Sequence, residues 1–203
     1  MRLRLFAAAL LLLLLGACAS APPSNTANIC SMFDERRSWY HAAKKSEERW
    51  AIPTPVAMAF IGQESGFRAR AKPPRKRILW IFPGPRPSNA FGYAQALDST
   101  WSDYRGSAGG WSARRSNFAD AVDFVGWYNR MSVRENGIAP SDAYNLYLAY
   151  HEGNGGFRRR TYEGKGWLLQ TARNVQNNAS RYEAQLQGCE RSLGRSWLQR
   201  LLF

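Results

Sequence analysis

Apolar residues recur at helical spacing along most of the chain. This spacing predicts helices over residues 31–50, 54–65, 96–104, 116–134, 140–151 and 166–187, joined by turns that contain Gly or Pro. Thr54 as an N-cap before Pro55 is typical of a helix start, and Gly66 is typical of a helix end. The pattern therefore predicts a mainly α fold, and the length of 203 residues suits a single domain.

One internal segment cannot follow this pattern. Residues 72–87 contain five prolines, which exclude a long helix, and several Lys and Arg residues. Within this segment, residues 78–82 are apolar and could form a short strand or an apolar flap. We expect this Pro-rich basic insertion to be an exposed loop; the alternatives are a lid over a site or a surface for a partner in the cell envelope.

The pattern of the first 18 residues predicts a targeting signal. A basic start, an apolar stretch at residues 5–15 and small residues after it are typical of a secretory signal peptide, and the stretch is too short to span a bilayer comfortably. Residues 15–18, Leu-Gly-Ala-Cys, resemble a bacterial lipobox, which implies cleavage before Cys18 and acylation of its thiol. The alternative is an ordinary signal peptide with an incidental cysteine. Because Ala19 is not Asp, we expect a periplasmic lipoprotein anchored to the outer membrane rather than to the inner one.

The other two cysteines outline the folded part of the chain. In an oxidising compartment a pair such as Cys30 and Cys189 is expected to form a disulfide, and two free buried thiols are the alternative. The chain then divides into a signal peptide (1–17), a lipidated tether (18–29), a folded domain (30–189) and a basic C-terminal tail (190–203). His41 and His151 belong to no cluster with zinc spacing, so no metal site is expected.

The charge of the chain indicates an anionic partner. Its net charge is +13, from 28 basic and 15 acidic residues, and loss of Arg2 and Arg4 with the signal peptide leaves +11. Such a surface attracts nucleic acid, anionic lipid or an anionic cell envelope. Export makes nucleic acid an unexpected partner. The tail at 190–203 could touch the membrane as an amphipathic helix, although a solvated end is the simpler interpretation.

Glu64 is the first candidate for catalysis. Ala57, Ile61 and Glu64 fall on one stripe of the helix predicted over residues 54–65, so the carboxyl sits at the edge of an apolar face in the last helical turn. Partial burial and the negative end of the helix dipole both raise the pKa of a carboxyl in that place. A general acid near neutral pH needs such a pKa. On these residues alone, a solvated glutamate in the last turn is the simpler interpretation.

Three short segments in a fixed order strengthen the catalytic interpretation. They read QESGF at residues 63–67, SNAFGYAQ at 88–95 and AYHEG at 149–153. They resemble the motifs of the SLT-type lytic transglycosylases, which are Glu-Ser, Ser-x-Ala-x-Gly-Leu-Met-Gln and Ala-Tyr-Asn-x-Gly. The resemblance covers about residues 47–187. This chain departs from the motifs where Tyr93 and Ala94 replace Leu-Met and where His151 replaces Asn, and residues 72–87 lengthen the usual connection.

The resemblance implies a lysozyme-like single domain and a role for each matching residue. Glu64 is implied to be the single catalytic acid and base. Ser88 and Gln95 would contact the sugar, Ser65 would support the catalytic end of its helix within the substrate site, and Tyr150 would direct its hydroxyl toward the Glu64 carboxyl. The implied reaction is that of a carbon–oxygen lyase on cell-wall peptidoglycan. It cleaves between N-acetylmuramic acid and N-acetylglucosamine, leaves 1,6-anhydro ends and needs no cofactor.

Two other functions remain open on the sequence. A muramidase-type hydrolase on the same fold needs a second carboxylate, and Asp98, Asp103, Glu152 and Glu163 form no persuasive pairing with Glu64. A non-catalytic lipoprotein that binds peptidoglycan would not need a proton donor at position 64. Aromatic residues could stack on sugars, with Trp80, Trp101 and Trp127 as candidates, although core packing is the simpler interpretation for each.

Overall fold

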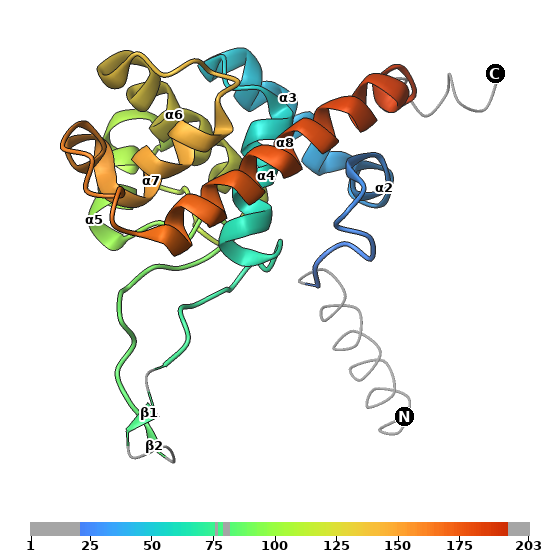
Figure 1. The fold of residues 1–203 in the computed structure, drawn as a ribbon. Helices are drawn as coiled ribbons and strands as arrows, with labels where there is room; N and C mark the ends of the chain where they lie inside the picture. The colour runs from blue at the N-terminus through green and yellow to red at the C-terminus, as the bar shows by residue number, and fades with distance from the viewer. Residues whose placement is uncertain (1–20, 76, 79–81, 195–203) are drawn as a thin grey trace, which may run out of the picture.

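The computed structural model describes residues 21–75, 77–78 and 82–194 (Figure 1). The predicted signal peptide, Cys18, Trp80 and most of the C-terminal tail lie outside the described residues. The described helices are α2 (Ile29–Glu35), α3 (Arg37–Trp50), α4 (Thr54–Ser65), α5 (Asp98–Tyr104), α6 (Phe118–Asn136), α7 (Ala143–Arg158) and α8 (Gly166–Leu193), with a π-helical turn η1 (Arg105–Gly109) after α5. The mainly α prediction is confirmed. No helix within this described part is both long and apolar enough to cross a membrane.

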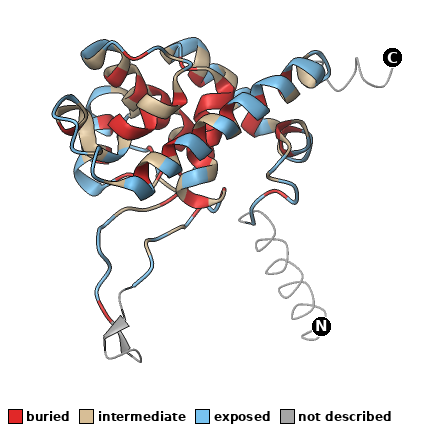
Figure 2. Ribbon diagram, viewed as in Figure 1, coloured by how far each residue is buried: buried red, intermediate tan, exposed pale blue. Residues whose placement is uncertain are grey.

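Helix α4 is the central element of the domain. Every residue from Thr54 to Ile61 is buried, because α3, α6 and α8 all pack against the helix (Figure 2). A helix that is apolar on all sides can be stable only in such a buried place. The helix ends as predicted at Gly66, which has φ +56° and donates its N–H to the Gly62 carbonyl. Its start differs in detail, because the Thr54 hydroxyl caps nothing and donates instead to Oε2 of Glu47 at 2.7 Å.

The largest differences from the predicted helix boundaries occur at three places. The helix expected over residues 31–50 is broken at Arg36, whose φ of −130° and ψ of 68° separate α2 from α3. Helix α7 continues past residue 151 through a kink at Gly153, where φ is 74° and ψ is 156°. Helix α8 runs past Cys189 to the buried Leu193, so its last turn lies within the segment predicted as a tail. The burial of Leu193 shows that packing extends α8 beyond the end that the apolar pattern predicts.

The Pro-rich segment at residues 72–87, which we call the arm, projects away from the helices (Figure 1). Strands β1 (Arg77–Ile78) and β2 (Phe82–Pro83) pair in antiparallel fashion, with Ile78 opposite Phe82. The single strand considered for residues 78–82 is therefore corrected to a hairpin, because its two ends pair with each other. The arm leaves the domain shortly after α4 and returns at the loop that leads to α5.

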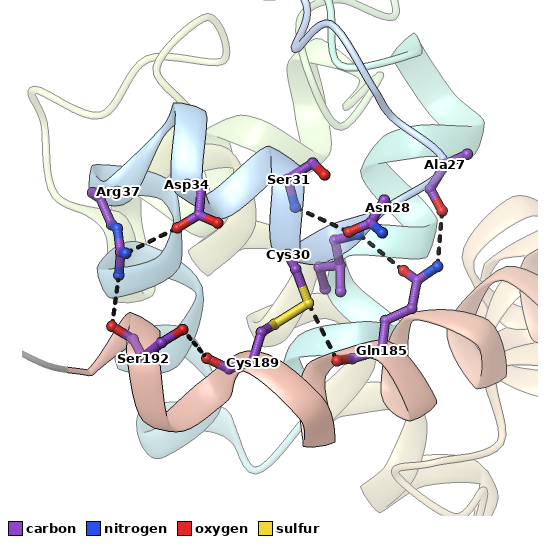
Figure 3. The surroundings of a disulfide bond; sticks show 10 residues. Ala27, Asn28, Cys30, Ser31, Asp34, Arg37, Gln185, Cys189 and Ser192 are labelled. Atoms are coloured by element: carbon purple, nitrogen blue, oxygen red, sulfur yellow. Dashed lines mark hydrogen bonds and ion pairs between the residues drawn. A yellow bond between two sulfur atoms is a disulfide. The ribbon is translucent and has the colours of Figure 1, made fainter.

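The two ends of the domain are joined by a disulfide between Cys30 in α2 and Cys189 in α8, with an S–S distance of 2.04 Å (Figure 3). Residues 21–28, which fall in the predicted tether, also contact the domain. The Tyr182 hydroxyl donates to the Thr26 carbonyl at 2.5 Å, and the Gln185 amide donates to the Ala27 carbonyl at 3.2 Å. Contacts with the folded domain therefore begin before Cys30.

Candidate active site

Glu64 lies in the last turn of α4, where its side chain is only partly accessible to water. Burial disfavours the charged form and raises the pKa of Glu64 from 4.5 to about 7. The Tyr147 hydroxyl on α7 hydrogen-bonds the carboxyl, which opposes this rise. A carboxyl with a pKa near neutral can both give a proton and take one back.

An aromatic cluster surrounds the end of α4. Phe60, one turn before Glu64, meets Tyr147 and Tyr150 of α7 edge-on, with ring centroids 5.4 Å apart in each pair. Burial, together with the nearby charge of Glu64, raises the pKa of both tyrosines above the usual value of 10. Both hydroxyls therefore keep their protons near neutral pH and serve as hydrogen-bond donors.

The direction of the Tyr150 hydroxyl corrects the sequence-based expectation. It donates to the Ala94 carbonyl at 2.6 Å instead of to the Glu64 carboxyl, and Tyr147 makes the contact with that carboxyl. The two tyrosines are three residues apart on one face of α7, so both reach the same region. Because the Ala94 carbonyl accepts the Tyr150 hydroxyl, Tyr147 is the tyrosine that hydrogen-bonds the carboxyl. A role for Tyr150 in binding substrate stays a prediction.

A cavity of about 290 Å³, which we call the aromatic cavity, lies beside this cluster. Gln95, Leu97, Tyr128, Tyr150, His151 and Glu152 are among the residues that line it. It brings the predicted residues Gln95 and Tyr150 together. Glu64 is not among the lining residues, but its charge acts on Tyr150, which forms part of the wall. The carboxyl is therefore close enough to act on this wall, and its side chain stays partly accessible to water.

Gln95 holds the loop that forms one side of this cavity. Its backbone has a positive φ of 46°, and its amide nitrogen donates to the carbonyls of Ala71 at 3.0 Å and Gly92 at 2.8 Å. These bonds tie the loop to the segment that follows α4. Its amide oxygen accepts no hydrogen bond from the described residues, so it is available to a hydroxyl or an amide N–H of a ligand.

The two predicted serines lie outside the aromatic cavity. Ser65 is 3% exposed and its hydroxyl donates to the Ile61 carbonyl at 3.0 Å, so it supports the end of α4, as the resemblance implies; a contact with substrate stays a prediction. Ser88 is exposed and lines a second cavity of about 380 Å³, where the arm joins the domain.

Among the four carboxylates considered as catalytic partners, Glu152 is the one that lines the aromatic cavity. Lys165 bonds both its oxygens at 2.7 and 2.8 Å, His151 lies 3.0 Å from Oε1, and Thr161 also donates to it. Although burial acts to raise it, these bonds hold the pKa of Glu152 at about 2. Glu152 is therefore a bound anion near neutral pH. In the described ranges, no three His, Cys, Asp or Glu side chains gather as they would around a metal ion.

Sequence reasoning missed Tyr147 and Trp167. The signal for Tyr147 was its position one turn before Tyr150. Trp167, at the start of α8, is 60% exposed, and its ring centroid lies 5.1 Å from that of His151, which lines the aromatic cavity. In contrast, Trp101 is 6% exposed, and Trp127 is partly buried against the same aromatic core. Exposure to solvent distinguishes Trp167 from the tryptophans that pack in the core, and the sequence pattern does not reveal exposure.

Comparison with known protein families matches residues 6–189 to the family described as the transglycosylase SLT domain. The match includes the described helices up to the disulfide in α8, the arm and every residue of the candidate site. No curated protein and no solved structure matches the chain. The family implies lytic transglycosylase activity on peptidoglycan in general, and the mainly helical structure agrees with its lysozyme-like fold. Since the match covers most of its length, the chain belongs to the SLT transglycosylase family.

Proposed function

We propose that this protein cleaves the bond between N-acetylmuramic acid and N-acetylglucosamine without water and leaves 1,6-anhydro-muramic ends. The observation that carries the proposal is the Glu64 carboxyl, which has a pKa of about 7 at the end of a buried helix and whose charge acts on Tyr150, a lining residue of the aromatic cavity. A protein that only binds glycan has no use for a carboxyl whose charged form is disfavoured in this way.

One carboxyl can perform both steps of this reaction. Protonated Glu64 donates its proton to the glycosidic oxygen as the bond to the muramic C1 breaks and positive charge develops there. The resulting carboxylate, which the Tyr147 hydroxyl stabilises, then removes the proton of the 6-hydroxyl. That oxygen bonds to C1 and closes the anhydro ring, so Glu64 is protonated again and no water is consumed.

The environment of Glu152 supports this reaction over hydrolysis. Hydrolysing glycosidases usually need a second carboxylate as a nucleophile or as a base for water. Glu152 is the acidic residue in the aromatic cavity, but its oxygens are already bonded by Lys165, Thr161 and His151. A carboxylate engaged in this way is a weak nucleophile and a weak base. A muramidase-type hydrolase is therefore the second candidate.

We further propose that the protein acts in the periplasm and is held at the outer membrane by a lipid on Cys18. The support is the lipobox-like sequence, together with a disulfide that suits an oxidising compartment. Metabolic labelling with a fatty acid tests the anchor. Label should enter the wild-type chain and be absent from Cys18→Ala; equal labelling of both would contradict the anchor.

The enzymatic proposal is tested by digesting purified peptidoglycan and identifying the products by mass spectrometry. We expect anhydro-muramic ends with the wild type and with Glu48→Gln, an exposed carboxyl on α3 that serves as the matched control. Glu64→Gln should give no product. Reducing muramic ends that depend on Glu64 would identify a hydrolase. Wall binding without any product would favour a binding protein.

A further inference from the structure

The second cavity, which we call the basic cavity, is formed where the arm joins the domain. Its volume is about 380 Å³, and Lys72, Arg86, Ser88, Phe91, Asp98 and Arg115 are among its lining residues. Lys72 belongs to the first residues of the arm and Arg86 to its last. The insertion that lengthens this chain relative to the family motifs therefore brings two cations into one cavity.

The positive charge of this cavity is only partly neutralised. Asp98 pairs with Arg115 at 2.7 Å, and Arg115 also donates to the carbonyls of Ala96 at 2.9 Å and Asn89 at 3.3 Å. Arg86 donates to a backbone carbonyl at the start of the arm. The Asp98 carboxylate is therefore the single anion among three cations in the lining of this cavity, and it is already paired with Arg115.

Lys72 has the least satisfied of these charges. Its ammonium lies 5.6 Å from the centroid of the Phe91 ring, and the Arg115 guanidinium lies 5.3 Å from the same ring. A cation over an aromatic face is held weakly and stays available to an anion. No carboxylate or carbonyl within the described part of the chain bonds the Lys72 ammonium. The Ser88 hydroxyl accepts the Ala90 N–H at 3.4 Å, which leaves its proton free to donate.

The basic cavity is joined to the aromatic cavity by a shared wall. Phe91 of the basic cavity and Ala96 of the aromatic cavity form an isolated β-bridge, in which the Phe91 N–H donates to the Ala96 carbonyl at 3.3 Å. Arg115 donates to the same carbonyl. A polymeric ligand seated in the aromatic cavity can therefore extend across this wall to the cations.

We propose that the basic cavity binds a carboxylate of the peptidoglycan strand, with Lys72 as its main partner and with Arg86 and Ser88 completing the site. The identity of the ligand rests on the proposed function, because a glycan of this kind supplies carboxylates in two places. Strands without peptides carry the lactyl carboxylate of muramic acid, whereas strands with peptides carry the carboxylates of the stem peptide. Both present the same planar anion to the cavity.

The test measures binding by the full chain in detergent, with Glu64→Gln present so that no ligand is cleaved. Titration calorimetry at low salt compares a neutral N-acetylglucosamine tetramer, a peptide-free glycan tetrasaccharide with lactyl carboxylates and the same tetrasaccharide with stem peptides. The cavity variant is Lys72→Gln with Arg86→Gln. The matched control is Lys45→Gln with Arg173→Gln, which removes two exposed charges from α3 and α8.

We expect the cavity variant to bind a carboxylate-bearing probe about fivefold more weakly and to bind the neutral tetramer with unchanged affinity. A fivefold loss corresponds to the upper end of what an exposed ion pair contributes to binding. The probe that loses affinity identifies the source of the carboxylate. The proposal is overturned if the cavity variant binds every probe with unchanged affinity, or if neither carboxylate-bearing probe binds. It is also overturned if the matched control loses as much affinity as the cavity variant. The calorimetry measures binding by an inactive variant, whereas the product assay measures cleavage by the wild type. The carboxylate site can therefore be refuted while anhydro products still form, and it can be supported even if none form.

Discussion

Replacing Glu64 by Gln should stabilise the protein at neutral and alkaline pH and change its stability little in acid. The pKa of Glu64 is about 7 in the folded protein and 4.5 in the unfolded chain. The folded state therefore favours the protonated form, and the wild type loses stability as pH rises from 4.5 through 7, whereas Gln does not titrate. At about 1.4 kcal/mol per unit of pKa difference, the full effect is about 3 kcal/mol.

The measurement is urea unfolding of the wild type and Glu64→Gln at several pH values, with the disulfide kept oxidised. The difference in free energy of unfolding should grow between about pH 4 and about pH 7 and become constant above that range. Glu48→Gln, which changes an exposed carboxyl, should give a difference that does not vary with pH. If the Glu64→Gln difference is equally flat, the carboxyl is not desolvated, and Glu64 lacks the raised pKa that a single acid and base requires.

Three further predictions concern the surroundings of the site. Tyr147→Phe removes the hydrogen bond that lowers the pKa of Glu64, so the alkaline fall in kcat/KM should move to higher pH. Replacing Cys30 and Cys189 together by Ser opens a bridge across 159 residues and should lower the free energy of unfolding by up to about 5 kcal/mol in non-reducing urea. Trp167→Ala removes an exposed ring beside His151 and should weaken binding of glycan fragments about five- to tenfold in titration calorimetry.

Each of these predictions has a matched control or a contrary outcome. An alkaline limb that does not move in Tyr147→Phe would assign the titration to a group other than Glu64. Equal stability of the wild type and the double Ser variant would mean that the contacts of residues 21–28 with α8 hold the chain ends without the bridge. Trp111, which is 86% exposed and lines neither cavity, is the control for Trp167. An equal loss of glycan affinity in Trp111→Ala would show that the Trp167 ring is not a specific stacking site for sugars.

The apolar pattern predicted α4 best because local chemistry marks both of its ends. Pro55 suits the first turn, and Gly66 adopts the left-handed conformation that ends the helix. The break at Arg36 has no such mark, and it arises where α2 turns to pack against α8. At Gly153 the sequence suggested a stop, but the chain makes one non-helical step and resumes the helix.

The motifs located the site better than they assigned its contacts. They singled out Glu64, Gln95 and Tyr150 from three distant segments, and the structure brings these segments together. The choice between Tyr147 and Tyr150 as the partner of the carboxyl depends on the Ala94 carbonyl, 56 residues away in the chain from Tyr150. A motif records which residue types are present, whereas such a contact depends on how two elements pack.

The charged residues around the two cavities separate the proposed acid from the cations. Burial raises the pKa of Glu64 to about 7, and the Tyr147 hydrogen bond, rather than a Lys or Arg among the described residues, opposes this rise. Glu152 shows the opposite outcome, because Lys165 and its neighbours hold its pKa at about 2. A cation placed beside Glu64 to attract an anionic glycan would lower its pKa in the same way and remove the acid. The cations that recognise the strand therefore have to lie apart from the acid, and Lys72 and Arg86 lie across the Phe91–Ala96 bridge from the aromatic cavity beside Glu64.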